Sequence, residues 1–243
     1  PPRSTLFPYT TLFRSVSALK APDGMQLDWS PLILSLVLAA VTTGLLLVLG
    51  IPLAWWLVRR KTLVRHAVTA FVMLPLALPP TVLGFYLLLA LGPHGPLGAL
   101  AERWSGASFA FTFTGLVMAS MVYSLPLVVQ PLAAGFERLD MRHLETASVL
   151  GAGPWDRWMS VTLPLLRADL LTGAVLGFIH TFGEFGVVLM VGGDIPGRTR
   201  VLSLAIYDHV QSLEYHQADL MSAAAVGMSF TALLLLYLAQ RRR

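Results

Sequence analysis

The stretch PLILSLVLAAVTTGLLLVLGIPLAWWLV, residues 31–58, carries no charged side chain. The hydrocarbon core of a bilayer is about 30 Å thick, and a helix needs about 20 apolar residues to cross it. Apolar and polar residues do not alternate along this stretch, as they would in a strand of a membrane barrel. Residues 31–58 therefore predict a transmembrane helix.

Other stretches of the chain have the same character. Residues 67–91, 109–133, 165–191 and 218–239 are each long and apolar enough to form a span. The chain of 243 residues is 56% hydrophobic and 12% charged, with a mean hydropathy of +0.70, whereas soluble domains are about a quarter charged. We expect an all-α, polytopic membrane protein with about five to six transmembrane helices in one domain, residues 25–243.

The first residues differ from the rest of the chain. Residues 1–24 begin with PPRSTLFPYTTLFRS, which has no initiator methionine and lacks the ordered regions of a signal peptide. The segment resembles translated sequencing adapter, and we expect it to be a non-native or disordered leader, with Met25 as the native start. The chain has no cysteine, which excludes disulfides and cysteine metal sites but does not fix the compartment.

Lysines and arginines are distributed unequally between the loops. One side of the expected spans has Arg59, Arg60, Lys61, Arg65, Arg138, Arg142, Arg157, Arg167, Arg241, Arg242 and Arg243, and the other side, outside the leader, has Arg103, Arg198 and Arg200. Because basic loops stay in the cytoplasm, we expect the N-terminus outside and the C-terminus inside. These residues flank apolar runs and form no interleaved patch, so nucleic acid is not an expected partner.

The loop between the third and fourth spans contains HLETASVLGAGPWDRWMSVTLP, residues 143–164. Gly151 and Gly153 are expected to end one short helix, because glycine adopts left-handed backbone angles at little cost. Pro154 suits the first turn of a second helix. We expect a cytoplasmic elbow over 140–164, with a turn at residues 162–164 leading into the fourth span. An ordinary loop with amphipathic helices lying on the membrane is the alternative interpretation.

The spacing within this elbow resembles a known signature. The order Glu145-Thr146-Ala147, three residues, Gly151, nine residues, Val161-Thr162-Leu163-Pro164 resembles the EAA loop of bacterial ABC importer permeases. The chain departs from that signature at Thr146 and Val161. In that family the loop is a coupling helix that docks on a cytoplasmic ATPase subunit. The resemblance therefore implies ATPase-coupling roles for the following residues: Glu145, Thr146, Ala147, Gly151, Leu163 and Pro164.

Three further stretches narrow the resemblance. LPLALPPTVLGFYLL in the second span, GEFG at residues 183–186 and IPGRTRVLSLAIYDHVQ at residues 195–211 are similar to molybdate permeases, and the likeness covers residues 25–243. Sulfate and thiosulfate permeases share the EAA loop and a GEFG-like turn, so they remain the alternative. The resemblance implies a type I ABC importer permease for molybdate, and for tungstate with it, in the bacterial cytoplasmic (inner) membrane.

The resemblance also implies a set of partners. Two copies of the permease form a homodimer, two cytoplasmic ABC ATPase subunits bind to it, and a periplasmic or lipid-anchored oxyanion-binding protein delivers the anion. An ATPase would need a G-x-x-x-x-G-K-[ST] loop to hold phosphate, and the chain has no Gly-Lys pair. We therefore expect a transport subunit that is not itself an enzyme and binds no cofactor, with ATP used by the partner ATPase.

Several residues within the spans are candidates for the pathway or a gate. His180 and Glu184 are four residues apart and are expected to share one helix face, and an ionisable side chain in a span tends to face a cavity or a partner. Two ligands are too few for a metal site, and a carboxylate repels an anionic substrate. Glycines allow close approach or local unwinding, and prolines favour kinks. The candidates are Pro75, Pro79, Pro80, His180, Gly183, Glu184 and Gly186.

The pair His180 and Glu184 leaves two other classes of function open. An ion-gradient-driven secondary transporter or channel could use the pair as a proton relay, but such a protein has no need of a docking elbow. A membrane-embedded enzyme would need a nucleophile or a third ligand beside the pair.

The outer loop before the last span carries Arg198 and Arg200. A guanidinium group matches oxyanions and also pairs with acidic side chains, so both residues are candidates for contact with the binding protein. Solvated loop charges are the alternative for each of them. The spacing of Leu202, Leu204, Ala205 and Val210 predicts a short helix along the outer surface.

Overall fold

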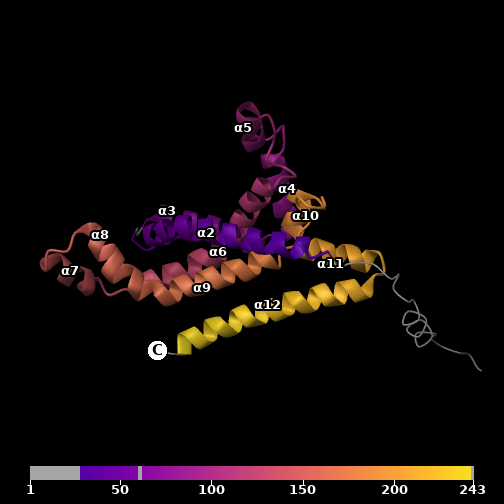
Figure 1. Ribbon diagram of the computed structural model, residues 1–243. Coiled ribbons are helices and arrows are strands. Elements are labelled where there is room, and N and C mark those ends of the chain that lie inside the picture. The colour runs from indigo at the N-terminus through magenta and orange to yellow at the C-terminus, as the bar shows by residue number, and fades with distance from the viewer. Residues whose placement is uncertain (1–27, 60–61, 242–243) are drawn as a thin grey trace, which may run out of the picture.

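The computed structural model describes residues 28–59 and 62–241, and within those ranges it is helical with no strand. The expectations for residues 1–24, Met25, Arg60, Lys61, Arg242 and Arg243 lie outside the described residues. The chain runs through helices α2 (Ser30–Arg59), α3 (Leu63–Ala77), α4 (Pro80–Leu91), α5 (Pro96–Ser105), α6 (Phe113–Arg138), α7 (Met141–Val149), α8 (Pro154–Arg157), a π-helical turn η1 (Trp158–Thr162), α9 (Leu163–Phe182), α10 (Gly186–Gly192), α11 (Leu202–Gln211) and α12 (Tyr215–Arg241) (Figure 1).

Five helical stretches of the described chain are long and apolar enough to cross a membrane: Ser30–Arg59, Pro80–Trp104, Phe113–Arg138, Pro154–Phe182 and Tyr215–Arg241. This confirms the expected all-α, polytopic fold. The expected span 31–58 corresponds to α2, 109–133 to most of α6, and 218–239 to α12.

The centre of the molecule is formed by α2, α6 and α9, which lie side by side (Figure 1). Half of the residues in the apolar stretch of α6 that could cross a membrane are buried inside the protein, whereas 11% are buried in the corresponding stretch of α12. α12 packs on α9 and α11 at the edge of the bundle. Leucine and valine side chains from the three central helices fill the space between them. The buried members of this cluster include Leu46, Leu57, Val128, Val129, Leu132, Phe136 and Leu166.

The second expected span, residues 67–91, is divided into two helices. α3 ends at Ala77 and α4 begins at Pro80, while Leu78 between them has an extended backbone with φ −88° and ψ 143°. A residue before proline is pushed toward extended angles, and Pro79 is followed directly by another proline at the first turn of α4. The prolines therefore break this helix where a kink was expected.

The fourth expected span, residues 165–191, is also divided. α9 ends at Phe182, Gly183 caps it, and α10 restarts at Gly186. Because of this break, α10 leaves the direction of α9 and packs against α4 (Figure 1). The two interrupted spans thus meet each other at their breaks.

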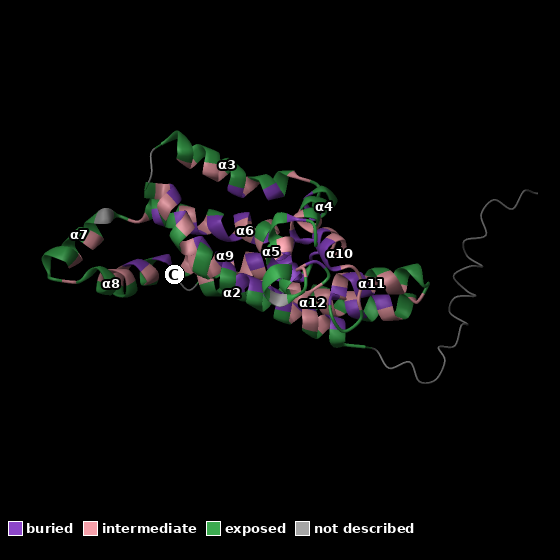
Figure 2. Cartoon of the chain, turned by 90° about the horizontal axis from the view of Figure 1, so that it is seen from above, coloured by how far each residue is buried: buried purple, intermediate pink, exposed green. Residues whose placement is uncertain are grey.

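The elbow lies at one end of the bundle. α7 and α8 project beyond the end of α2, and α12 ends toward the same side, whereas α11 lies at the opposite end (Figure 1). Figure 2 shows that α7 is largely exposed, while buried residues run along α6 and α9. The expectation of two short helices in the elbow therefore agrees with α7 and α8.

The expected turn at residues 162–164 does not occur. α8, η1 and α9 form one continuous helical stretch, and the backbone N–H of Leu163 donates to the carbonyl oxygen of Trp158 in a π-helical turn. Pro164 has no N–H to donate one turn back, which normally disrupts an α-helix. The wider π-helical turn immediately before Pro164 carries the helix past this proline without a change of element.

Candidate functional site: the elbow and a cavity in the bundle

Backbone capping defines both ends of α7. At its start, the Asp140 carboxylate accepts a hydrogen bond from the backbone N–H of Arg142 at 2.9 Å. At its end, Gly151 has φ +86°, its N–H donates to Ser148 O, and the N–H of Ala152 donates to Ala147 O, each at 3.0 Å. This pair of bonds is a Schellman motif, which requires the left-handed angles that glycine adopts. Gly151 therefore sets the direction in which the chain leaves α7.

A side-chain bond ties the two helices of the elbow together. Arg157 on α8 donates through Nη1 to the Ser148 hydroxyl on α7 at 3.1 Å. Pro154 occupies the first turn of α8 after Gly153, as the sequence predicts. The elbow is therefore a defined pair of helices rather than an irregular loop.

The predicted coupling residues lie in two groups. Glu145, Thr146 and Gly151 are exposed on the elbow, and Ala147 is half-buried. Leu163 and Pro164 lie past the π-helical turn at the start of α9 and are separate from this group. The structure thus brings together four of the six residues.

Large apolar side chains of the elbow are exposed at the surface of the chain. Val149 is 88% exposed, Leu150 81% and Trp155 71%. Exposed apolar patches commonly mark contacts with a partner. The sequence pattern singled out none of these three residues, although each follows or precedes the glycines that shape the elbow.

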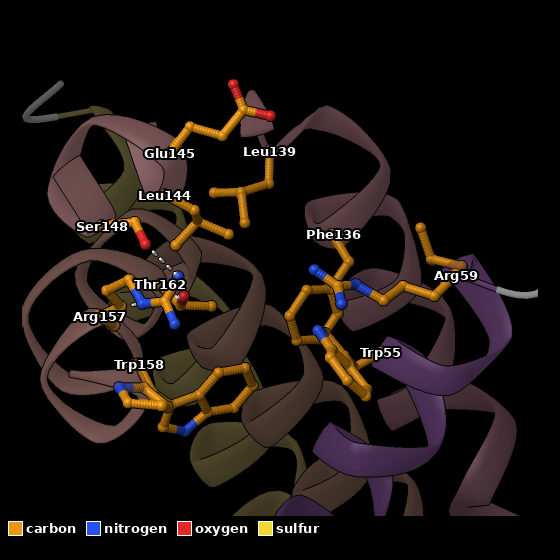
Figure 3. A pocket seen from close by; sticks show the side chains of 12 residues that line it. Trp55, Arg59, Phe136, Leu139, Leu144, Glu145, Ser148, Arg157, Trp158 and Thr162 are labelled. Carbon is orange, nitrogen blue, oxygen red and sulfur yellow. Dashed lines mark hydrogen bonds between the residues drawn. The ribbon is translucent and has the colours of Figure 1, made fainter. Parts of the chain in front are cut away.

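A cavity of about 430 Å³ separates the elbow from the ends of α2 and α6 (Figure 3). Aromatic rings form much of its wall, and two guanidinium groups reach its interior. Its lining consists of Trp55, Val58, Arg59, Phe136, Leu139, Leu144, Glu145, Ser148, Pro154, Arg157, Trp158 and Thr162. Of this set, the sequence indicated a functional role only for Glu145.

A second cavity, of about 390 Å³, lies where α4 and α10 meet α6 and α9. Five of the predicted gate candidates line it together with Thr81, Tyr123, Phe185 and Leu189; these five are Pro80, His180, Gly183, Glu184 and Gly186. Pro75, buried in α3, and Pro79, at the start of α4, do not line this cavity. Residues that are far apart in the sequence are therefore gathered at the two helix breaks.

His180 and Glu184 do not share a face of one continuous helix, contrary to expectation. His180 lies in the last turn of α9, and Glu184 lies in the break before α10, because the helix ends at Phe182. Spacing alone assumes that the helix continues, and the glycines on both sides of the break remove that assumption. Both side chains nevertheless line the same cavity, His180 from the last turn of α9 and Glu184 from the break.

Each of these two ionisable side chains has a distinct environment. Ser124 Oγ lies 2.9 Å from His180 Nδ1 and 2.9 Å from Thr181 Oγ1, and the rings of Tyr123 and His180 are 4.6 Å apart. Glu184 is only 5% exposed, and neither carboxylate oxygen forms a well-aligned hydrogen bond with the described residues, although the Ser120 hydroxyl lies beside it. A buried carboxylate without such a bond is costly, so its position in a cavity is the feature that needs a functional explanation.

Gly186 allows α10 to approach α4. A Cβ added to Gly186 would lie 2.7 Å from the Cβ of Pro80. The same addition at Gly183 would meet only the carbonyl oxygen of Ile179, at an ordinary 3.5 Å. Of the two predicted glycines, Gly186 is therefore the one required for close packing at the cavity.

The two arginines of the loop between α10 and α11 differ in their surroundings. Arg200 forms a bidentate pair with Asp194, at 2.8 and 3.0 Å, and a third bond to Asp208 at 2.8 Å. The hydrogen bonds that Arg200 donates to the Asp194 carboxylate raise the pKa of Arg200 above its ordinary value. Arg198 is exposed and has no ion pair among the described residues. Arg200 thus holds this loop to α11, while Arg198 is exposed at the surface.

The predicted outer helix forms as α11, but one face of it is in the protein core. Leu202, Leu204 and Ala205 are buried, whereas Val210 is 42% exposed. The Leu202 N–H donates to the Ser35 hydroxyl of α2 at 2.7 Å. The helix therefore packs on α2 and does not lie free along the outer surface.

Comparison with protein families identifies the architecture. Residues 46–242 match the family described as binding-protein-dependent transport system inner membrane component. The chain belongs to this family. It is therefore a multi-pass permease subunit of an ABC transporter in the inner membrane, and it is not an enzyme by itself.

Relatives of the permease agree with this assignment. The chain is 52% identical over 214 residues to the molybdenum transport system permease protein ModB of Azotobacter vinelandii, covering 88% of this chain and 95% of the relative. It is 36% identical over 185 residues to the Escherichia coli K12 protein of the same name, covering 76% and 81%. A probable sulfate transport system permease protein cysT of Zygnema circumcarinatum is 32% identical over 203 residues, covering 84% and 69%.

Solved structures share the fold of the permease. A chain of the inward-facing MetNI methionine ABC transporter matches with a TM-score of 0.66 at 16% identity, covering 92% of this chain and 99% of that chain. A chain of a bacterial alginate importer matches with a TM-score of 0.62 at 19% identity, covering 98% and 89%. The predicted type I importer fold is confirmed.

Proposed function

We propose that this permease carries molybdate, and tungstate with it, across the inner membrane into the cytoplasm. The single observation that carries the proposal is the 52% identity to a molybdenum transport permease over 88% of the chain and 95% of the relative. The likeness to the sulfate permease is lower, at 32% identity over 69% of that relative. Sulfate import is therefore the weaker reading of the same fold.

The elbow is proposed to receive the energy of ATP from a separate subunit. The chain has no Gly-Lys pair and so no phosphate loop of its own. The exposed Glu145 and Thr146 carry the EAA signature, and the apolar side chains of Val149 and Leu150 beside them are suited to contact with a protein. We propose that two ATPase subunits bind two such elbows on a homodimer of the permease.

The orientation proposed is N-terminus outside and C-terminus inside. The end of α2, the elbow and the end of α12 lie toward one end of the molecule, and α11 lies at the other (Figure 1). In the sequence, the segments that continue from these ends, residues 59–65, 138–167 and 241–243, hold 11 of the 17 lysines and arginines, as cytoplasmic loops do. In this orientation the outer loop with Arg198 faces the oxyanion-binding protein, while Leu163 and Pro164 connect the elbow to the membrane.

The cavity around Glu184 is proposed to be part of a gate in the pathway. Two broken spans meet there, and broken helices in transporters commonly lie beside substrate pathways. The Ser120 hydroxyl lies beside the Glu184 carboxylate, but neither carboxylate oxygen forms a well-aligned hydrogen bond with the described residues. A different packing of α4 against α10 can supply one. Like charge argues against direct contact between Glu184 and the anion, so its proposed role is to stabilise one state of the gate.

The identity of the substrate is tested on the oxyanion-binding protein, because this partner selects the anion. The oxyanion-binding protein that works with this permease is purified, and its affinities for molybdate, tungstate and sulfate are measured by calorimetry. Tight binding of molybdate and tungstate, with sulfate much weaker, is the expected result. A preference for sulfate would replace the proposal with sulfate import.

The coupling role of the elbow is tested by Glu145→Ala in the complete transporter. Uptake is expected to fall because the ATPase no longer moves with the elbow, while the permease remains folded because Glu145 is exposed. Glu102→Ala is the matched control, because Glu102 is also an exposed carboxylate but lies on α5, away from the elbow. This variant is expected to leave uptake unchanged. Equal uptake by both variants would contradict the coupling role.

A further inference from the structure

The cavity between the elbow and the bundle lies next to an apolar groove. The groove has a volume of about 690 Å³ and is lined by Val48, Ile51, Pro52, Trp55, Trp155 and Trp158. Trp55 and Trp158 also line the 430 Å³ cavity beneath α7, so the two spaces share a wall. One end of this combined site is charged and aromatic, and the other is almost wholly apolar.

Two arginines give the charged end a positive character. Figure 3 shows the guanidinium groups of Arg59 and Arg157 coming from opposite sides of the cavity. Arg59 lies over the ring of Trp55 at 4.5 Å, and neither arginine pairs with a carboxylate of the described residues. The Nε atom of Arg157 is buried without an acceptor in the same part of the chain. A buried donor of this kind needs an acceptor, and an anion with several oxygens can supply one.

The other charged group of the cavity does not neutralise these arginines. Glu145 also lines the cavity, but its carboxylate points away from Arg157 toward the rim (Figure 3). The remaining polar side chains, Ser148 and Thr162, are neutral. The cavity interior therefore favours a phosphate or another anion with several acceptor oxygens, which guanidinium groups bind in bidentate fashion.

The apolar end is open at the outside of the bundle, where the proposed orientation places lipid. Val48 is 68% exposed and Trp155 71%. Tryptophan side chains are enriched at the level of lipid headgroups, with the ring in the apolar layer. A small inorganic anion would fill the charged end and leave this groove empty.

From this arrangement we propose that the site binds one anionic phospholipid. Its phosphate lies between Arg59 and Arg157, and one acyl chain follows the groove past Trp55 and Trp158. Basic pockets beside transmembrane helices on the cytoplasmic side suit anionic headgroups. The proposal rests on the proposed orientation, which puts this end of the bundle at the cytoplasmic leaflet. The bound lipid braces the elbow against α2 and α6.

The test is native mass spectrometry of the complete transporter in mild detergent. Dioleoyl-phosphatidylglycerol, which is anionic, and dioleoyl-phosphatidylcholine, which is neutral overall, are offered in equal amounts. The wild-type permease is expected to retain phosphatidylglycerol preferentially. Arg59→Gln and Arg157→Gln are each expected to weaken its retention about fivefold, and the double variant to lose the preference. Arg103→Gln, on α5 and lining neither space, is expected to retain it.

Two outcomes would overturn the lipid site: an unchanged preference in the double variant, or equal competition by inorganic phosphate, which would indicate a free-anion site. Arg157→Gln also removes the bond to Ser148, so Arg59→Gln, which leaves that bond intact, is read separately. For this variant, phosphatidylglycerol with brominated acyl chains is expected to quench tryptophan fluorescence less than in the wild type, and equal quenching would contradict the site. A transporter that imports molybdate without any lipid preference refutes only this inference, whereas lipid preference without molybdate import refutes only the proposed function.

Discussion

Gly151 and Gly153 stand two residues apart in the elbow, and the structure distinguishes them. Gly151 has φ +86°, whereas Gly153 has φ −64° and ψ 165°, which any residue adopts. A Cβ at either position meets open space. The difference between them is therefore one of backbone conformation alone.

We predict that Gly151→Ala weakens the elbow and Gly153→Ala does not. An alanine in the left-handed conformation costs roughly 1–2 kcal/mol, which opens the end of α7 about tenfold more often. Amide hydrogen exchange of α7 should accelerate by that factor, and uptake by the complete transporter should fall. Equal exchange rates in the two variants would contradict the role assigned to Gly151.

The start of α2 offers a prediction about pH. The Asp28 carboxylate accepts bonds from the Ser30 backbone N–H and hydroxyl, both at 2.8 Å, and these bonds lower the pKa of Asp28. Because the pKa of Asp28 is lower in the folded protein than in the unfolded chain, the ionised carboxylate stabilises the folded state at pH values above the ordinary aspartate pKa. This stabilisation is lost as the pH falls through the pKa that Asp28 has in the folded protein. Ser30→Ala should raise the Asp28 pKa part of the way, since the backbone donor remains. Carboxyl NMR titration measures this, and an unchanged pKa would refute the hydroxyl's contribution.

At the scale of elements, the two helix breaks organise the permease. α3 and α4 are separated at Leu78 and Pro79, and α9 and α10 are separated around Glu184. The second halves of the two broken spans, α4 and α10, pack on each other, with Gly186 against Pro80. The cavity around Glu184 exists because the breaks face each other.

We predict that Gly186→Ala disrupts this contact and that Gly183→Ala is tolerated. The new Cβ at position 186 would lie 2.7 Å from Pro80, too close to be accommodated without displacement of α4 or α10; overpacking of this kind costs typically 1–3 kcal/mol. Uptake and the thermal unfolding temperature should both fall for Gly186→Ala only. Similar losses in both variants would show that the approach of α10 to α4 is not the deciding feature.

The sequence predicted the apolar helices and the elbow well, because uncharged runs and Gly-Pro signals are local. It indicated special behaviour at Pro79, Pro80, Gly183 and Gly186, but it could not show that their breaks face each other, since that depends on tertiary packing. The turn expected before Pro164 was wrong because a π-helical turn absorbs that proline. The pairing of Arg200 with Asp194 was equally out of reach, as nothing local distinguishes it from a solvated arginine.

At the scale of the whole molecule, the orientation in the membrane can be tested directly. The chain has no cysteine, so single cysteines report their own side. Val149→Cys on the elbow tip and Leu213→Cys between α11 and α12 replace side chains that are 88% and 71% exposed. A membrane-impermeant maleimide should label Leu213→Cys in intact cells and Val149→Cys only after lysis. The reverse pattern would invert the proposed topology.

The central claim is that the permease imports molybdate with energy from a separate ATPase. It is tested most directly by transport into proteoliposomes that contain the permease with its ATPase, the binding protein and ATP on the ATPase side. Molybdate uptake that requires ATP and both partners, and that persists in excess sulfate, is the expected result. Uptake driven by an ion gradient without the ATPase, or uptake of sulfate in preference to molybdate, would contradict it.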